Sequence, residues 1–338
     1  MTKDEIFMTR CIQLATLGKG NVAPNPMVGA VIVYNNQIIG EGYHEFIGGP
    51  HAEVNAINSV KNPALLQNAT IYVSLEPCAH FGKTPPCADL IVSKKFKRVV
   101  IGCQDSFSKV NGAGIKRIQD NGIEIAKGVL EQECRELNNH FFYFHEKKKP
   151  FITIKWAESI DGYIDNNGLQ TQISCAETSI FTHQLRKENQ AILVGRTTVE
   201  NDNPSLTTRN VSGRNPTRII LDPNNKLTKV HKVFNDESKT IVYNKTANDS
   251  ISVEQVHLLD FKLETILNDL YKKNIQSVLV EGGAYTIKQF LDANEWNIIH
   301  QIISPLKLND GTLAPKIELT PKKSRDHFSD RINTYINK

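Results

Sequence analysis

One histidine, one glutamate and two cysteines near the start of the chain have the types and spacing of a catalytic metal site. Zinc prefers four ligands drawn from imidazole and thiolate groups, and a catalytic zinc keeps one of the four positions for water. His51, Cys78 and Cys87 could provide the three protein ligands. Glu53 follows the histidine by two residues, so its carboxylate could face the water without binding the metal. The sequence therefore predicts a zinc (Zn²⁺) site in which Glu53 moves protons.

These groups suit the replacement of an amino group on a nucleobase-like ring by oxygen. Zinc lowers the pKa of a bound water from about 15.7 to about 7, which makes water reactive near neutral pH. A neighbouring carboxylate can then take a proton from the water and deliver it to the ring nitrogen and the departing ammonia. Zinc deaminases carry His-x-Glu followed by Pro-Cys-x-x-Cys. This chain has His-Ala-Glu at 51–53 and Pro-Cys at 77–78, but its second cysteine comes nine positions after the first.

Each part of this pattern is common in proteins without a metal, and only the combination favours catalysis. A purely structural zinc would need a fourth protein ligand, and His80 is the nearby candidate. The chain has six cysteines in 338 residues, too few for a disulfide scaffold. A close pair such as Cys78 and Cys87 therefore indicates a metal site or catalysis.

Alternating helices and strands are predicted to position these residues, which indicates an α/β layer structure. A helix is predicted over 4–16, followed by two strands within 27–43 that join at Asn35 and Asn36. Further strands are predicted at 70–77, 98–103 and 123–128, with helices over 52–60, from Cys87, over 112–121 and over 131–142. Both thiolates could then lie at helix N-termini, where amide dipoles favour the charged sulfur.

A second unit is predicted after the charged segment 145–150, which lacks apolar periodicity and ends in proline. We place the domains at 1–146 and 150–338, which suits a chain of this length. The second unit again alternates, with strands expected at 151–159, 191–195, 217–222, 240–244, 277–283 and 298–305, and helices at 176–188 and 284–294. The tail beyond these elements is polar and weakly patterned.

Composition limits the classes of ligand and location. The formal net charge of +4 is spread over mixed signs, which argues against a nucleic-acid surface but allows pockets for small acidic molecules. No apolar stretch approaches the roughly 18 residues of a membrane helix, and the first ten residues lack the pattern of a signal peptide. We therefore expect a cytoplasmic protein without a membrane partner, and a homo-oligomer remains open.

Three stretches resemble the deaminase half of the bifunctional riboflavin-biosynthesis deaminase/reductase family, which has the cytidine-deaminase-like α/β/α fold. They are "APNPMVGAVIV" from residue 23, "GYHEFIGGPHAE" from residue 42 and "SLEPCAHFGKTPPCADLI" from residue 74. The likeness extends from about residue 3 to 127 and includes the long insert between the cysteines. The resemblance implies that His51, Cys78 and Cys87 hold zinc and that Glu53 is the general acid and base.

The resemblance also implies substrate contacts in this half. Asn25 and His44 would contact the pyrimidine or ribose, and Lys83 would meet the 5′-phosphate. An ammonium on a short loop beside zinc is a plausible phosphate ligand. Taken alone, Asn25 could form a turn, His44 could be an ordinary strand residue, and Lys83 could be a solvated loop lysine.

One departure from the family pattern lies after the predicted strand at 98–103. The family has Asp-Pro-Asn-Pro there, whereas this chain keeps Asp105 but has Phe107 at the asparagine position. Ser106 or Asn111 could take over the missing contact.

Four later stretches resemble the reductase domain of the same family, which has a dihydrofolate-reductase-like α/β fold and uses NADPH. They begin at residues 155, 191, 216 and 277. The resemblance implies that the NADPH site is lined by Ala157, Gln172, Thr198, Asp202 and Gly283. It implies that the ribosyl-pyrimidine is contacted by Gln170, Arg186, Leu206, Arg209 and Glu281. Gln172 replaces an aromatic residue of the family, and the chain lacks a Rossmann Gly-x-Gly-x-x-Gly motif.

Physical chemistry supports some of these roles. Gly282 and Gly283 at a strand-to-helix turn would let backbone amides approach a cofactor phosphate, although a tight turn needs no ligand. Arg186 and Arg209 could clamp a substrate phosphate, although Arg186 alone would more commonly be a solvated charge. Glu281 could orient or protonate the opened sugar while nicotinamide reduces its C1′ atom.

We therefore expect a bifunctional enzyme, a zinc hydrolase followed by an NADPH-dependent oxidoreductase. As the resemblance implies, it deaminates 2,5-diamino-6-ribosylamino-4(3H)-pyrimidinone 5′-phosphate and then reduces the ribosyl chain to ribityl. One rival is a zinc deaminase of another base, such as tRNA adenosine, with an unrelated C-terminal module. The other is a non-catalytic binding protein on the same fold, motivated by Phe107 and Gln172.

Overall fold

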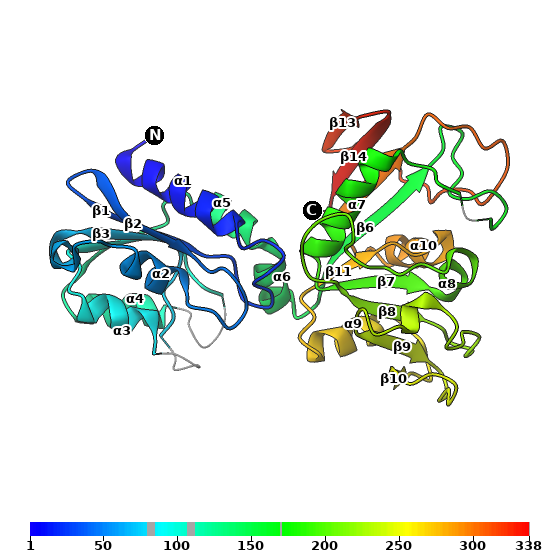
Figure 1. Cartoon of the computed structure of the whole chain (residues 1–338), viewed down its shortest axis with the longest axis horizontal. Helices are drawn as coiled ribbons and strands as arrows, with labels where there is room; N and C mark the ends of the chain where they lie inside the picture. Colours follow the sequence, from blue (N-terminus) through cyan, green and yellow to red (C-terminus); the bar gives the residue numbers. More distant parts are fainter. Residues whose placement is uncertain (80–84, 107–111, 170, 338) are drawn as a thin grey trace. The chain divides into compact units, whose positions relative to one another are not determined.

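The computed structural model describes residues 1–79, 85–106, 112–169 and 171–337. It divides into two compact units, Met1–Lys147 and Lys148–Lys338. Each unit is a β-sheet with helices on both faces (Figure 1). Among the described residues, every helix is too short or too polar to cross a lipid bilayer.

The first unit is built on a five-stranded sheet in the order β2-β1-β3-β4-β5. Its strands are β1 (Gly29–Tyr34), β2 (Gln37–Tyr43), β3 (Thr70–Leu75), β4 (Arg98–Cys103) and β5 (Glu124–Lys127). The first two form the predicted hairpin, and Asn35 and Asn36 in its turn have φ of 50° and 61°, a conformation that asparagine tolerates. Strands β3, β4 and β5 are parallel, so their carboxyl ends share one edge.

Helices cover both faces of this sheet. One face carries α1 (Lys3–Thr16), α5 (Glu131–Leu137) and α6 (Asn139–Lys147); the other carries α2 (Ala52–Asn58), α3 (Cys87–Ser93) and α4 (Ala113–Asp120). A short 3₁₀ helix spans Pro63–Asn68. Successive residues of β1 face opposite layers: Val31 and Val33 pack in the α1 core and Ile32 packs in the α2 core. The predicted α/β/α layering is therefore confirmed.

The helix predicted over 131–142 is in fact two helices that meet at Asn138. The Asn138 side chain accepts a hydrogen bond from the Met27 amide at 2.7 Å and donates one to the Met27 carbonyl at 2.8 Å. This pairing fixes the segment before β1, which leads from Asn25 into the sheet. Met27 lies 111 residues before Asn138 in the sequence, so the apolar periodicity of 131–142 could not predict the break between the two helices.

The second unit has a nine-stranded sheet in the order β10-β9-β8-β7-β11-β6-β12-β14-β13. Its strands are β6 (Phe151–Glu158), β7 (Ala191–Gly195), β8 (Thr217–Leu221), β9 (Thr240–Asn244), β10 (Glu254–His257), β11 (Ser277–Val280), β12 (Ile298–Ile303), β13 (Lys323–His327) and β14 (Asp330–Ile336). The strands from β10 to β12 are parallel, and the last two form an antiparallel hairpin on β12.

Helices again lie on both faces (Figure 1). Helices α7 (Ala176–Glu188) and α8 (Arg196–Asp202) pack on one face, and α9 (Leu263–Lys272) and α10 (Ala284–Asp292) pack on the other. A 3₁₀ turn spans Lys232–Phe234. This arrangement belongs to the dihydrofolate-reductase-like fold class that we predicted.

Four elements of this unit escaped prediction: α8, α9, β10 and the β13–β14 hairpin. Helix α9 carries a usable signal, because Leu263, Ile266, Leu267 and Leu270 recur at helical spacing. The hairpin carries little signal. Residues 323–326 are all exposed, so β13 lacks the apolar alternation that marks a half-buried strand.

A fully buried arginine holds the loops of the second unit together. Arg218 in β8 donates from Nε to the Ser205 carbonyl at 2.9 Å. Its Nη1 donates to the carbonyls of Val233 and Asn235, each at 3.0 Å, and its Nη2 donates to the Asn235 side chain at 2.8 Å. The guanidinium therefore binds the segment before β8 to the 3₁₀ turn between β8 and β9.

We predict that Arg218→Met destabilises the second unit by about 3–5 kcal/mol, because several buried carbonyls lose their donor together. Trp156 and Trp296 are the chain's only two tryptophans, and both are buried in this unit, so denaturant unfolding followed by tryptophan fluorescence reports on it alone. Arg331→Met, in the exposed ion pair with Asp326, is the matched control and should cost less than about 1 kcal/mol. Equal effects of the two changes would contradict the role of Arg218.

Candidate active sites

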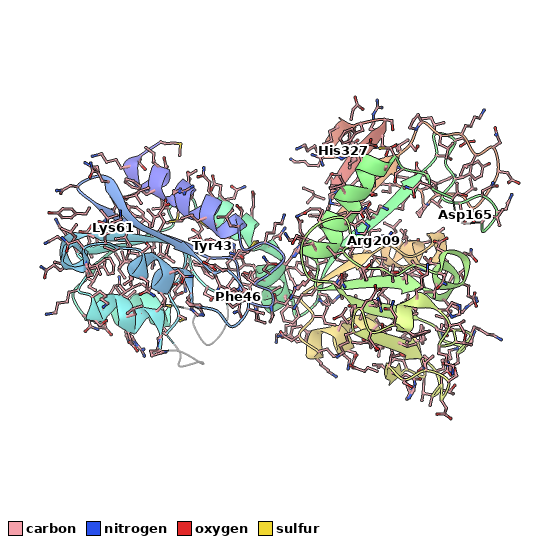
Figure 2. All side chains as sticks on the ribbon, in the orientation of Figure 1. Tyr43, Phe46, Lys61, Asp165, Arg209 and His327 are labelled. Carbon is pink, nitrogen blue, oxygen red and sulfur yellow. The ribbon has the colours of Figure 1, made fainter. Side chains whose placement is uncertain are left out.

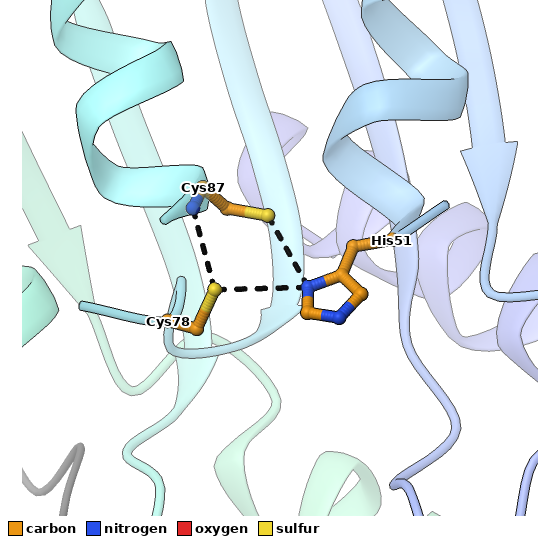
Figure 3. Close-up of side chains that lie close together, drawn as sticks. All are labelled: His51, Cys78 and Cys87. Carbon is orange, nitrogen blue, oxygen red and sulfur yellow. Dashed lines mark hydrogen bonds between the residues drawn. The ribbon is translucent and has the colours of Figure 1, made fainter. Parts of the chain in front are cut away.

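His51, Cys78 and Cys87 converge at one end of the first sheet (Figure 3). His51 Nδ1 lies 3.6 Å from Cys78 Sγ and 3.3 Å from Cys87 Sγ, and the three ligand atoms lie within 4.8 Å of one another. Nitrogen and sulfur ligands of a tetrahedral zinc are about 3.6 Å apart, so this set fits zinc with a fourth position open. Within the described ranges, no other group of three or more His, Cys, Asp or Glu side chains is arranged this way.

The ends of two helices and one strand bring these ligands together. His51 is the N-cap residue of α2, and Cys87 is the first residue of α3. Cys78 follows β3 in an irregular segment. Its sulfur accepts a hydrogen bond from the Cys87 amide at 3.3 Å, which places it at the N-terminus of α3. Both sulfurs therefore lie at a helix N-terminus, as the sequence led us to expect.

The two sulfurs differ in acidity. A hydrogen bond from the Cys87 thiol lowers the pKa of Cys78 below its usual range, with His51 and the Cys87 amide acting in the same direction. The same hydrogen bond raises the pKa of Cys87. Cys78 is therefore the sulfur prepared to bind a cation as thiolate, and a bound metal would take the place of the shared proton.

Glu53 lies in the first turn of α2 and is only 3% exposed. Burial raises its pKa to about 7, while the neighbouring His51 opposes the shift. A carboxyl group in this range can both accept and release a proton near neutral pH. The alternative fourth ligand, His80, lies outside the described residues, as do Lys83, Phe107 and Asn111.

Two glycines in β2 allow α2 to pack directly against the strand. A Cβ atom on Gly42 would lie 2.3 Å from the Ala56 amide nitrogen and 2.7 Å from the Ala52 carbonyl oxygen. A Cβ atom on Gly40 would lie 2.6 Å from the Ala56 carbonyl oxygen. The helix that begins at His51 therefore rests directly on the strand backbone, and a side chain on the strand would push it away.

Asn25 and His44 lie next to the cysteine and histidine cluster. His44 Nδ1 donates to the Pro50 carbonyl at 3.0 Å, so Nε2 is free to accept from the Asn25 amide group, 3.1 Å away. The His44 ring lies 5.5 Å from the His51 ring. Burial lowers the pKa of His44, which keeps the ring neutral in this arrangement. The structure thus brings both predicted substrate residues to the metal site.

A cavity of about 1260 Å³ occupies the second unit, larger than the usual 300–1,000 Å³ of small-molecule sites. Its lining includes nine of the residues predicted for the cofactor and the substrate: Ala157, Gln172, Thr198, Asp202, Gly283, Arg186, Leu206, Arg209 and Glu281. Gln170 lies outside the described residues. Figure 2 labels Arg209 and Asp165, which also lines the cavity.

Two strand-to-helix turns meet at this cavity, one after β7 and one after β11. The Gly283 amide donates to the Thr198 hydroxyl at 2.8 Å. A Cβ atom on Gly282 would lie 3.0 Å from the Gly195 nitrogen and 3.1 Å from Val194 Cα. The predicted glycine pair therefore lets the two turns touch through their backbones. Gln172, at the aromatic position of the family, bonds instead to the Ser174 carbonyl at 2.8 Å.

Arg186 is not a solvated charge, which was the alternative interpretation. It forms a bidentate ion pair with Glu281, with Nε–Oε1 at 2.8 Å and Nη2–Oε2 at 2.9 Å. Its Nη1 donates to the Thr207 carbonyl at 3.2 Å. Burial acts to raise the pKa of Glu281, but Arg186 outweighs burial and the pKa is lowered. Glu281 is therefore a stabilised carboxylate.

Lys155 lines the same cavity and was missed in the sequence. Burial lowers its pKa, while Glu281 attracts its positive charge. The residue sits in the middle of β6, where a charged side chain stands between the apolar residues Ile154 and Trp156. Because strands buried on both faces are almost continuously apolar, that interruption is the signal that could have marked Lys155 as functional.

His183 is the second residue that was missed, and it supports Arg209. The Arg209 amide donates to His183 Nδ1 at 3.1 Å, and the Thr208 amide donates to the Asn215 side chain at 2.8 Å. Leu206 has φ of 55°, a buried side chain and a place in the cavity lining. Segment 205–209 is thus shaped by side chains from α7 and from the following loop.

The fold and the two sites define a zinc-dependent deaminase domain followed by a reductase domain. Residues 1–103 match the cytidine and deoxycytidylate deaminase zinc-binding region, and residues 150–323 match the RibD C-terminal domain. The riboflavin biosynthesis protein RibD of Aquifex aeolicus is 40% identical over 91% of this chain and 88% of its own length.

Two solved structures have the same architecture across nearly the whole chain. The diaminohydroxyphosphoribosylaminopyrimidine deaminase/5-amino-6-(5-phosphoribosylamino)uracil reductase of Thermotoga maritima is 38% identical, with 98% of each chain covered and a TM-score of 0.89. Acinetobacter baumannii RibD is 30% identical, covers 99% of this chain and 98% of its own, and has a TM-score of 0.91. This chain belongs to the RibD family of riboflavin biosynthesis proteins. It is a bifunctional enzyme with a zinc-dependent deaminase and an NADPH-dependent reductase activity.

We predict that His183 makes the second unit sensitive to acid. Burial, with Arg186 and Arg209, lowers its pKa from 6.5 to about 4, so the unfolded chain binds more protons between these pH values. The stability that the neutral His183 ring contributes to the folded state is fully present above pH 6.5 and is lost as the pH falls toward 4. When the pH is lowered from about 7 to about 5, the free energy of unfolding should therefore fall by about 2 kcal/mol less for His183→Asn than for the wild type. Urea unfolding followed by tryptophan fluorescence measures this difference, and parallel pH profiles would contradict it.

Proposed function

We propose that the first unit deaminates 2,5-diamino-6-ribosylamino-4(3H)-pyrimidinone 5′-phosphate and that the second unit reduces the ribosyl chain of the product to ribityl. The main support is the convergence of His51, Cys78 and Cys87 on one point beside a buried glutamate. The Thermotoga maritima relative is named for the same pair of reactions. A deaminase of another base is not favoured, because the second unit matches the RibD C-terminal domain.

In the first unit, His51, Cys78 and Cys87 hold zinc, and Glu53 is the catalytic acid and base. When bound, zinc would supply Lewis-acid activation of a water molecule. Glu53 would accept one proton of that water and deliver it to the ring nitrogen. It would then carry the second proton of the same water to the amino group, which leaves as ammonia while the carbonyl forms.

Asn25 and His44 orient the pyrimidine. His44 accepts a hydrogen bond from the Asn25 amide group, which fixes the orientation of the Asn25 side chain. Its carbonyl oxygen is then placed to accept a hydrogen bond from an amino group of the substrate. The neutral His44 ring adds no charge next to the zinc ligands. Lys83 is proposed to hold the 5′-phosphate.

In the second unit, the cofactor lies against Ala157, Gln172, Thr198, Asp202 and Gly283, which all line the cavity. NADPH supplies the hydride that reduces C1′ of the ring-opened substrate. The chain contributes orientation and exclusion of water, which carry most of the rate in such a transfer.

Substrate contacts on the other side of the cavity come from Gln170, Arg186, Leu206, Arg209 and Glu281. Arg209 is exposed and lines the cavity, so it can meet a phosphate directly. Arg186 uses three of its N–H groups for Glu281 and Thr207, and two of its five remain for substrate. Glu281 orients the opened sugar as a carboxylate, because its lowered pKa makes it a poor proton donor at neutral pH.

We also propose that the protein works in the cytoplasm on small-molecule substrates without binding nucleic acid. The cavity of the second unit and the metal cluster of the first support a small-molecule substrate.

We predict that Glu53→Gln lowers the rate of ammonia release by about 10²–10⁴-fold, because a general acid and base is lost while the side-chain shape is kept. Zinc content should stay at the wild-type value, and NADPH oxidation with the deaminated intermediate should continue at the wild-type rate. Both assays use the full chain with the diaminopyrimidine phosphate or its deaminated product. Ammonia release that survives the substitution would overturn the role of Glu53 and with it the proposed deaminase mechanism.

We predict that Cys87→Ser removes zinc, because a neutral hydroxyl replaces one of three protein ligands. Metal analysis of the purified wild type should give about one zinc per chain, and the variant should hold much less. Cys175→Ser is the matched control, since this cysteine lies in the second unit and outside the cluster. Equal zinc contents in the wild type and Cys87→Ser would sink the assignment of the metal site.

A further inference from the structure

Glu76 lies between β3 and Cys78, is 4% exposed, and receives four backbone N–H groups. Its Oε1 accepts from the amides of Gly114 at 3.0 Å and Ile115 at 3.3 Å. Its Oε2 accepts from the amides of Gly112 at 3.0 Å and Asp105 at 3.3 Å. A carboxylate has about four acceptor positions, so backbone amides fill its capacity.

These amides belong to the start of α4 and to the segment after β4. The N-cap position of α4 is Gly112, which has no side chain to cap the helix. Free amides at a helix start need an acceptor, and Glu76 provides it from a different part of the chain. The carboxylate therefore ties α4 to the strand that leads to the metal site.

Close backbone packing strengthens the same link. A Cβ atom on Gly114 would lie 2.0 Å from the Pro77 carbonyl oxygen, so α4 rests directly on the peptide before Cys78. The Glu76 amide donates to the Cys103 carbonyl at 3.0 Å, which joins the segment to the end of β4. The two residues before Cys78 are thus held by β4, through Glu76, and by α4, against Pro77.

We propose that Glu76 is a positioning residue that holds Cys78 at its metal-binding place and also fixes Asp105 and Gly112. These last two residues stand on either side of 106–111, the stretch where the chain departs from the family pattern at Phe107. One side chain therefore links a zinc ligand to the segment predicted to meet the substrate. This inference rests on the zinc site of the proposed function and adds a residue that acts through Cys78.

Two substitutions of Glu76 test whether its hydrogen-bond acceptors or its size matter for zinc binding. Glu76→Gln keeps the size but turns an NH₂ group toward two of the four amide donors, so these lose their acceptor. Glu76→Asp keeps the carboxylate but withdraws it by one methylene, so the bonds lengthen without a change of chemistry. Glu41→Gln is the matched control, because it makes the same change in the same unit at the ion pair with Arg10.

The experiment measures zinc affinity of the full-length protein by competition with a chromophoric chelator. Partners that orient metal ligands typically contribute 10–100-fold to affinity, so Glu76→Gln should bind zinc about 10–100-fold more weakly. Glu76→Asp should fall between this variant and the wild type, and Glu41→Gln should stay within about twofold of the wild type. NADPH oxidation by the second unit should be unchanged in all three variants.

A purely structural role predicts a different result. Circular dichroism of the zinc-free proteins reports on both units, and tryptophan fluorescence reports on the second unit alone. A loss of dichroism at unchanged fluorescence therefore measures the unfolded fraction of the first unit, and the zinc affinity is corrected for that fraction. Wild-type affinity in the folded fraction of Glu76→Gln, or in Glu76→Asp should Glu76→Gln not fold, would overturn the inference. Absence of zinc from the wild type would instead overturn the proposed function, so the two failures are distinguishable.

Discussion

Both sites depend on hydrogen bonds between a buried charged side chain and the backbone of irregular segments. In the first unit, the Glu76 carboxylate accepts four amide N–H groups around the turn that carries Cys78. In the second unit, the Arg218 guanidinium donates to carbonyls of the segments before and after β8. The two charges have opposite sign because Glu76 accepts hydrogen bonds from backbone amides, whereas Arg218 donates hydrogen bonds to backbone carbonyls. Each ion is costly to bury alone and is stable only with its full set of partners.

Irregular segments need side-chain partners because their backbone groups cannot form hydrogen bonds within the sheets. Parallel strands place their carboxyl ends at one edge, and the segments that follow these ends carry functional residues in many α/β proteins. A backbone that leaves the sheet loses its ladder hydrogen bonds and must find others when it is buried. Segment 205–209 shows the same solution, since His183, Arg186, Asn215 and Arg218 each bond to its backbone. Precise placement of Arg209 or Cys78 is therefore a property of side chains elsewhere in the sequence.

This dependence explains what the sequence could predict. The candidate zinc ligands could be predicted because His-x-Glu, Pro-Cys and a second nearby cysteine point to a metal site in combination, although each part is common. The layers could be predicted because apolar periodicity is local. Glu76, His183 and Arg218 could not be found, because their partners are backbone groups that every residue carries. Lys155 is an intermediate case. The sequence shows a charge between the apolar residues Ile154 and Trp156 of β6, but the neighbouring charges of Arg186 and Glu281 become apparent only in the fold.

Two buried glutamates show how the surroundings set the chemistry of one residue type. Glu53 is buried without a guanidinium partner, and burial raises its pKa to about 7. Glu281 is buried against Arg186, and the ion pair lowers its pKa despite burial. Deamination needs a group that takes up a proton and returns it, which requires a pKa near the working pH. Glu281 stays charged near neutral pH, so in the proposed reduction it can orient the sugar while the hydride comes from the cofactor. The same residue type therefore has two protonation behaviours, and among the described residues the ion pair with Arg186 is what distinguishes Glu281 from Glu53.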